Sequence, residues 1–283
     1  MNRAQATWLP DRRRLHLHHG PIDMIVDVTG PGRQAALERA VLRFDTLLQE
    51  LVDALPRLRS ETGPMPVGEA ARRMVQATRL FAADRFVTPM AAVAGAGADT
   101  ILRAICAGPG VDKAYVNNGG DIAFHLTGGQ DMRVALAADD TARVVIGQND
   151  PVRGVATSGW RGRSQSLGIA DSVTVLAQNA AVADVAATLI ANAVNLAGHR
   201  AITRAPAYDL NPDSDLGDRL VTVDVGPLTP GEVVLALDAG ADFATQCHTH
   251  GLIAGAAILL QGQTRYVGHV PMMSFHETEK LHA

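Results

Sequence analysis

The sequence predicts an α+β protein in which mixed sheets pack with helices. Apolar–polar alternation with a period of two marks several strands, and apolar residues that recur every three or four positions mark several helices. Hairpin patterns lie near both ends of the chain, at residues 13–29 and 255–268, which favours antiparallel sheets over a doubly wound parallel sheet. The chain has 283 residues, 47% of them hydrophobic, so it can bury a substantial core. Because we find no repeat or clear linker, we predict a single domain over residues 1–283.

The N-terminal part of the chain predicts a hairpin followed by two helices. Gly20-Pro21 marks the turn between two strand-like segments. The basic run Arg12-Arg13-Arg14 is expected to be a solvated approach to the first strand. Helix periodicity then runs from Leu37 to Leu55 and stops before Pro56, because the residue before a proline disfavours the helical conformation. A second helix is predicted over residues 68–81.

A run of small residues over 90–108 is predicted to be helical, although each glycine in a helix interior costs about 1 kcal/mol. Gly95 and Gly97 therefore indicate the close approach of another backbone or of a ligand. The remaining elements are predicted in this order: strand, glycine turn and strand over 113–126; an irregular stretch with a short strand over 139–155; a strand over 172–178; a long Ala-rich helix over 180–198; a loop over 206–216; a strand over 219–226; and a helix from about 230 to 245.

Composition argues against several classes of protein. The net charge of -4 gives no general attraction to nucleic acid or to anionic lipid. The first residues lack the apolar stretch of a signal peptide, and no window approaches the roughly 18 uninterrupted apolar residues of a membrane-spanning helix. We therefore expect a cytoplasmic protein in which Cys106 and Cys247 are reduced thiols. Cys247, His248 and His250 could supply three zinc ligands, and solvated or hydrogen-bonded histidines are the alternative.

Three separated segments carry residue types suited to ligand binding, and the first is Asn117–Asp121. Gly119 and Gly120 can turn the backbone with positive φ and present bare N–H groups. Asn118 and Asp121 flank these glycines with side chains that can bond either the backbone or a ligand. The segment therefore predicts either a tight hairpin turn or a ligand-binding loop.

The second segment is Gly154–Gly159, which is followed closely by Arg161 and Arg163. Small hydroxyl residues, Thr157 and Ser158, lie beside glycine, and arginines behind them suit the recognition of a phosphate or carboxylate group. A surface loop with solvated arginines is the alternative. The segment lacks the G-x-S-x-G elbow, which argues against a nucleophilic serine.

The third segment lies inside the Ala-rich helix, where Asp184 precedes Thr188 by four positions. Residues four apart share one face of a helix, so the carboxylate and the hydroxyl point the same way. Both are hard oxygen donors of the kind that Mg²⁺ or Ca²⁺ prefers. A charge at Asp184 is costly among these apolar residues unless it is paired or coordinated, which favours a metal site.

Taken in order, the strings VNNGGDI and GVATSG and the helix motif A-D-x-x-x-T resemble the ApbE superfamily, the Mg²⁺-dependent FAD:protein FMN transferases. The whole chain is similar to an uncharacterised ApbE-like family, since blocks such as AYVNNGGDIAFHL and GLIAGAAILLQGQTRYVG follow in the same order. The resemblance implies one T-fold-like domain. In the transferases the helix aspartate and hydroxyl bind the metal together with a main-chain alanine carbonyl. Carried over, the metal ligands are Asp184, Thr188 and the carbonyl of Ala91.

Two departures from the transferase pattern bear on function. Ala94 stands where the transferases have a flavin-binding lysine, although Gly95 and Asp99 match the same motif. The stretch after Gly159 also lacks their longer insert with paired histidines. The first hypothesis is therefore a metal-dependent enzyme acting on a small molecule with an anionic group, by FMN transfer from FAD or by FAD pyrophosphate cleavage. The alternatives are a metal-dependent hydrolase or ring-opening enzyme for a small non-flavin metabolite, and a non-catalytic protein that binds flavin or nucleotide.

The expected site combines residues of all three segments. Asp121 would orient a water or the substrate, and Arg161 or Arg163 would clamp the anionic group, with Arg163 as the catalytic candidate. Exposed small-residue helices also make a homodimer an expectation. The residues expected to contact a cofactor are Asn118, Gly119, Gly120, Thr157, Ser158 and Asp99.

Overall fold

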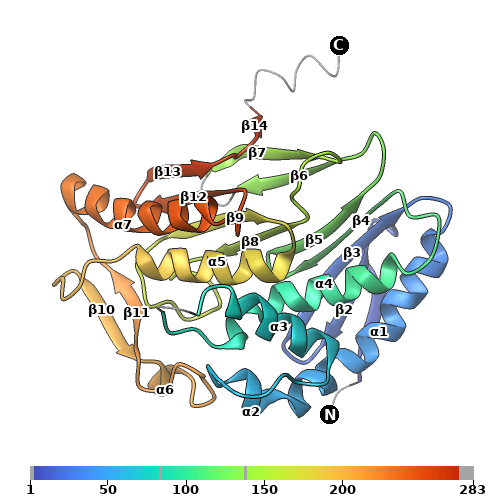
Figure 1. Ribbon diagram of the computed structural model, residues 1–283, viewed down its shortest axis with the longest axis horizontal. Coiled ribbons are helices and arrows are strands. Elements are labelled where there is room, and N and C mark those ends of the chain that lie inside the picture. The colour runs from blue at the N-terminus through green and yellow to red at the C-terminus, as the bar shows by residue number, and fades with distance from the viewer. Residues whose placement is uncertain (1–2, 83–84, 137–138, 274–283) are drawn as a thin grey trace. The chain divides into compact units, whose positions relative to one another are not determined.

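The computed structural model describes residues 3–82, 85–136 and 139–273. It has an α+β fold, which confirms the predicted class, with hairpins and helices interspersed along the chain (Figure 1). The chain divides into two compact units made of interleaved segments. The first unit contains residues 1–132, 146–156 and 177–185, and the second contains residues 133–145, 157–176 and 186–283. The single domain over residues 1–283 stays a prediction.

An antiparallel sheet is the framework of the first unit. The hairpins predicted around Gly20 and over 113–126 are confirmed, and their alternate residues are buried on one face. No pattern predicts the edge strand β1, because all four of its side chains are exposed and none alternates with a buried one. The strands lie in the order β1 (Gln5–Trp8), β2 (Leu15–His19), β3 (Ile22–Thr29), β4 (Lys113–Asn118) and β5 (Asp121–Leu126), with the start of β8 (Gly154–Ser158) beside β5.

Helices cover one face of this sheet. The periodicity from Leu37 onward forms α1 (Arg33–Asp53), which packs on β2 and β3, and the short α2 (Leu55–Leu58) follows it through Pro56. The predicted second helix is α3 (Glu69–Arg79). The small-residue run begins as a 3-10 turn, η1 (Pro89–Ala92), and continues as α4 (Val93–Ile105), which packs on β4 and β5.

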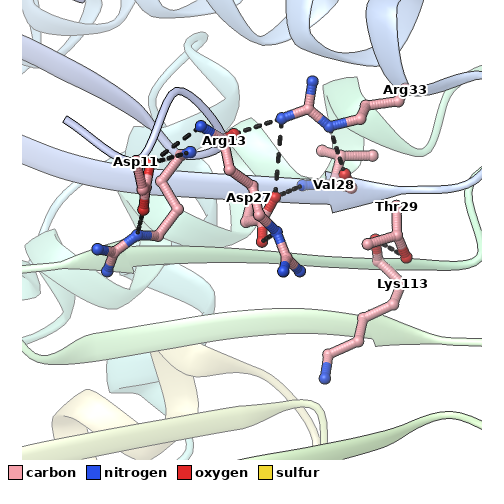
Figure 2. Close-up of polar contacts among 8 residues, drawn as sticks. Asp11, Arg13, Asp27, Val28, Thr29, Arg33 and Lys113 are labelled. Atoms are coloured by element: carbon pink, nitrogen blue, oxygen red, sulfur yellow. Dashed lines mark hydrogen bonds and ion pairs between the residues drawn. The ribbon is translucent and has the colours of Figure 1, made fainter. Parts of the chain in front are cut away.

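A buried carboxylate ties the N-terminal turn to β3 and α1 (Figure 2). Asp27 is 6% exposed and lies 2.9 Å from the guanidinium of Arg13 and 3.9 Å from that of Arg33. Arg33 also donates to the carbonyl oxygen of Val28 at 2.8 Å, and to that of Arg13. The run 12–14 is exposed, as expected for a solvated approach to the first strand, and Arg13 in addition pairs with Asp27. The charges of Arg13 and Arg33 together compensate this buried acid.

The second unit contains a smaller antiparallel sheet and a two-stranded ribbon. The order β9 (Ser172–Ala177), β12 (Gly255–Leu260), β13 (Gln263–Gly268) includes the predicted closing hairpin. It packs against α7 (Pro230–Thr249), which begins with a capping box between Thr229 and Glu232. The ribbon pairs β10 (Ile202–Pro206) with the predicted strand β11 (Leu220–Val225). No helix within the described residues has both the length and the apolar character needed to cross a membrane.

Several predicted boundaries are wrong in this part of the chain. The stretch 139–155 is not mainly irregular, because β7 (Asp139–Gly147) runs through it beside β6 (Asp131–Leu136) and the short β14 (Met272–Met273). The predicted loop 206–216 contains a short helix, α6 (Ala207–Leu210). The Ala-rich helix α5 (Ala180–Ala193) ends before Gly198, because the Val194 carbonyl accepts the amide of Ile169 instead of continuing the helix.

Candidate functional site

The N-terminal turn of α5 is held by an aspartate from another helix. The backbone amides of Ala180 and Ala181 donate to the two carboxylate oxygens of Asp99, on α4, at 3.1 and 2.9 Å. The Asn179 side chain accepts the next amide, that of Val182, at 2.9 Å. The first amides of a helix have no partner within the helix and carry its positive dipole end, so a carboxylate is well placed there. Asp99 is 8% exposed, and burial raises its pKa although the two amides act to lower it.

The same two helices exchange a second carboxylate in the opposite direction. The amide of Gly95, in the first turn of α4, donates to Asp184 Oδ2 on α5 at 3.0 Å, and the amide of Ala94 also bonds this carboxylate. Each helix therefore supplies an aspartate to the N-terminus of the other. Since Gly95 precedes Asp99 while Asp184 follows Ala180, the two helices run antiparallel at this contact.

Gly95 lets the two helix backbones touch. A Cβ atom at this position would lie closer to the Ala180 carbonyl oxygen than atoms can approach. A Cβ at Gly154, on β8, would collide in the same way with the backbone of Asn179. The close approach expected at Gly95 is thus confirmed for another backbone, and it fixes α5 against α4 within the first unit.

The β4–β5 turn brings a third acid to this contact. Asn118 and Asp121 are paired across the hairpin and are 9% and 8% exposed. The side-chain amide of Asn118 donates to the carbonyl oxygen of Ala94 at 2.9 Å, which ties the turn to the start of α4. Gly119 and Gly120 have φ of 66° and 114°, and the Gly120 amide donates to Asn117 Oδ1 at 2.9 Å. Within the described residues these glycines form a tight hairpin turn, the first of the two predicted alternatives.

Asp121 and Asp184 form a pair of carboxyl groups with little access to water. Burial raises the pKa of Asp184 well above its usual value, and the charge of Asp121 beside it raises that pKa further. The amides of Gly95 and Ala94 act in the opposite direction but do not offset both effects. Asp184 keeps part of its surface exposed. Two carboxylates this close cannot both be ionised at low cost, so the pair needs either a shared proton or a cation.

The other expected ligands lie on neighbouring turns of the same elements. Ala91 is a half-buried residue of η1, and its amide donates to the Thr88 carbonyl oxygen at 3.1 Å. Thr188 is half-buried one turn after Asp184 along α5, where the chain passes into the second unit. The structure thus brings Asp121, Asp184 and Asn118 together in the first unit, and none of the sequence patterns predicts the Gly95 amide as the partner of Asp184.

The second predicted segment belongs to the second unit from Thr157 onward. Thr157 is exposed and its hydroxyl lies 2.9 Å from that of Thr174, and Ser158 ends β8. Arg161 donates from Nε to Asp171 Oδ1 at 3.0 Å and lies 4.5 Å from the ring centroid of Trp160. Arg163 is exposed.

The Trp160 indole N–H also donates to Asp171 Oδ1, at 3.2 Å. Asp171 therefore organises this turn, which is a role that no local sequence pattern indicates. One of the two predicted arginines already has an acidic partner, and the other lies on the surface of the second unit.

The residues considered for zinc do not form a cluster. Cys247 is buried, whereas His248 and His250 are exposed, and both Cys247 and Cys106 are free thiols. Across residues 3–82, 85–136 and 139–273, no three His, Cys, Asp or Glu side chains come together as metal ligands. A cation at Asp184 would therefore need carbonyl or hydroxyl oxygens in addition to carboxylates.

Comparison with known proteins finds relatives over most of the chain. The family model described as AbpE bacteria matches residues 6–266. A UPF0280 protein of Methanothrix thermoacetophila is 35% identical over 165 residues, which cover 55% of this chain and 67% of that protein. Another, from Methanocaldococcus jannaschii, is 30% identical over 190 residues, 64% of this chain and 75% of that protein. The apo crystal structure of the Pseudomonas stutzeri flavinyl transferase ApbE aligns with 99% of this chain and 98% of its own, at 14% identity and a TM-score of 0.45.

Proposed function

Since the chain belongs to this AbpE bacteria family, we propose that it is a metal-dependent enzyme acting on a small molecule with an anionic group, a flavin nucleotide in the first instance. The observation that carries the proposal is the pair of Asp121 and Asp184. A purely structural carboxylate has no reason to face a second one in a buried place, because the repulsion lowers stability. Strongly perturbed acids of this kind cluster at functional sites.

The residues present fit a hard divalent cation such as Mg²⁺. The donors are oxygens, and a cation held by Asp184 would offset both the burial and the neighbouring charge of Asp121, which together raise the pKa of Asp184. The resemblance of the sequence to the flavin transferases adds the hydroxyl of Thr188 and the carbonyl of Ala91 to Asp184 as ligands. A metal at this position would supply charge neutralisation at a phosphoanhydride or polarisation of a carbonyl.

The protein's own residues would divide the remaining tasks. Asp121 would orient the attacking hydroxyl or water by accepting its hydrogen bond. Arg163, an exposed residue of the second unit, stays the predicted partner of an anionic group, because Arg161 is already held by Asp171. For FMN transfer from FAD, the attacking group would be a serine or threonine hydroxyl of an acceptor protein, whose oxygen bonds the FMN phosphorus as the phosphoanhydride bond breaks and AMP leaves. For cleavage of the FAD pyrophosphate, it would be water.

One observation favours a second candidate, a metal-dependent hydrolase or ring-opening enzyme acting on a small non-flavin metabolite. Ala94 presents only a methyl group at the start of α4, and its carbonyl oxygen is already bonded by Asn118. The place where the transferases carry a cation is therefore neutral here. This suits a smaller substrate with less negative charge than a dinucleotide.

A thermal-shift experiment with the full chain tests the proposal. After removal of metal with EDTA, Mg²⁺ at about 100 times its Kd should stabilise the protein by about 2.7 kcal/mol, which raises Tm by about 4–5 °C. FAD should raise Tm further only when Mg²⁺ is present. The variant Asp184→Asn should lose both effects, whereas Asp45→Asn, the same change on an exposed residue of α1, should keep them.

The outcomes separate the candidate functions. Equal stabilisation of Asp184→Asn and of the unchanged protein by Mg²⁺ would refute the metal site. A metal effect without a flavin effect would favour the hydrolase or ring-opening enzyme. If flavin stabilises Asp184→Ala as well, and no FAD is consumed, the protein is a non-catalytic binder. Formation of FMN, or attachment of FMN to an acceptor peptide with a central threonine, distinguishes cleavage from transfer.

A further inference from the structure

Both carboxylate oxygens of Asp99 accept backbone amides, and the sequence places this residue among the expected cofactor contacts. Its two carboxylate oxygens accept the amides of Ala180 and Ala181, and the residue is 8% exposed. Those amides form the anion-binding end of α5, which is therefore filled by a carboxylate of the chain itself. A phosphate group of a ligand would have to displace Asp99 to bind there.

The place of Asp99 along α4 connects it to the proposed metal ligand. Gly95 and Asp99 are four residues apart, so they share one face of α4. Their partners, Asp184 and the pair Ala180 and Ala181, likewise lie about one turn apart on α5. The two helices are thus fastened at two points one turn apart, once through each aspartate.

We infer that Asp99 is a positioning residue, which fixes the axial position of α5 so that the Asp184 carboxylate lies against the Gly95 amide and Asp121. A helix advances 1.5 Å per residue, so slippage of α5 by a single residue would break the Gly95 bond. The contact between Gly95 and the Ala180 carbonyl sets how close the helices lie. This contact does not stop α5 from sliding along its own axis. Directional hydrogen bonds are needed for that, and the two bonds to Asp99 provide them.

The effect of Asp99 on metal affinity rests on the proposed function, in which Asp184 binds the metal. A residue that only capped α5 would change the fraction of folded protein and leave the metal affinity of the folded molecules unchanged. A positioning residue changes the affinity itself. Residues that orient metal ligands from behind typically contribute 10–100-fold to metal affinity.

The test compares Asp99→Asn with a matched loss of a buried charge elsewhere in the first unit. Asp27 is on β3, away from α4 and α5. Its carboxylate is 6% exposed and paired with arginines, and Asp27→Asn removes it. Mn²⁺ affinity of each folded, metal-free variant would be measured by isothermal titration calorimetry in a stabilising osmolyte. Asp99→Asn should raise Kd about 10-fold, and Asp27→Asn should leave it within about twofold.

A second variant and a second measurement keep the inference open to refutation. Asp99→Glu retains the charge and the acceptor oxygens but adds a methylene, so it should also raise Kd by displacing α5. Hydrogen exchange of the Gly95 amide should quicken in both Asp99 variants and not in Asp27→Asn. Unchanged Kd and unchanged exchange in the two Asp99 variants would overturn the inference. If the unchanged protein fails to bind Mn²⁺ at all, the proposed function falls, while the exchange of Gly95 still tests the role of Asp99.

Discussion

The two ends of the contact between α4 and α5 are built alike and differ in the charge beside each carboxylate, which is that of Arg73 for Asp99 and that of Asp121 for Asp184. At each end an aspartate on an apolar, small-residue helix accepts amides from the first turn of the other helix. At the Asp99 end these amides and the helix dipole face the carboxylate. At the Asp184 end a second carboxylate, that of Asp121, stands beside it.

That difference separates a structural acid from a candidate functional one. Burial raises the pKa of both aspartates, but only Asp184 has a neighbouring acid that raises it further. Bonds to helix amides compensate a buried charge, which explains how Asp99 is tolerated. The like charge beside Asp184 lowers the stability of the protein. Local destabilisation of this kind is characteristic of ligand-binding and catalytic sites. Variants that disturb the two ends unequally therefore test whether Asp121 makes the Asp184 end functional.

The largest effect on the free energy of unfolding is expected where the Asp99 end and the Asp184 end are disturbed together. Gly95→Ala places a methyl group against the Ala180 carbonyl, so the helices must separate and both aspartates lose contact with their amides. We expect a loss of about 2–3 kcal/mol in the free energy of unfolding, as for other overpacked sites. Urea denaturation measures it.

Gly231→Ala is the matched control for that substitution. Gly231 lies exposed in the first turn of α7, where a Cβ meets nothing within 4 Å. The change should stabilise the protein by about 0.5–1 kcal/mol, because alanine favours helix over glycine. Equal losses in the two variants would show that the contact at Gly95 has no special role.

Asp121→Asn removes the carboxylate beside Asp184. We expect it to have smaller effects, of opposite sign on stability and on metal affinity. The metal-free protein should gain on the order of 1 kcal/mol, the equivalent of about one pKa unit. Mg²⁺ affinity should at the same time fall about 10-fold, as for the loss of a group that supports a metal ligand. Thermal unfolding with EDTA and calorimetric titration with Mg²⁺ give the two numbers. A variant that loses stability without metal would show that Asp121 is not in conflict with Asp184.

The sequence predicts the acids of this site better than their partners. Asp184 is conspicuous because it is a charge inside a run of alanines, and Asp121 because it follows two glycines of a hairpin. The partners are mostly main-chain groups: the Gly95 amide for Asp184 and the Ala94 carbonyl for Asn118. Backbone groups are the same in every residue, so only the small size of Gly95 signals that another backbone comes near.

Asp99 shows the limit of this reasoning most clearly. Its partners, Ala180 and Ala181, lie 81 and 82 residues further along the chain and are themselves ordinary alanines. No spacing within one helix relates a side chain to the N-terminus of another, so no local pattern indicates these partners. The cofactor contact that the family resemblance implies for Asp99 stays a prediction. The exposed edge strand β1 was missed for a related reason, since its partners are the backbone of β2 and its side chains carry no pattern.

The smallest expected effect is a dependence of stability on pH that is unequal at the two ends. An unfolded aspartate has a pKa near 4, and the folded pKa of Asp184 lies well above its usual value. Between these two values the folded protein holds a proton that the unfolded chain has lost, so the free energy of unfolding falls as pH rises through this window. The stabilisation due to this group is complete below about pH 4 and is lost as pH passes the raised pKa.

Urea denaturation of metal-free protein between about pH 5 and 8 would measure the slope within the range where folded proteins are usually most stable. The carboxyls of Asp11 and Glu232, whose pKa values are lowered to about 2 chiefly by backbone amides of Arg14 and Thr229, titrate below this range. Asp184→Asn should remove more of the slope than Asp99→Asn, because the pKa of Asp99 is raised without a neighbouring acid. Added Mg²⁺ should reverse the trend, since a cation binds the ionised pair and its stabilisation grows with pH. Equal slopes in the two variants would mean that Asp121 contributes nothing at the Asp184 end, and the distinction between the two aspartates would have to be abandoned.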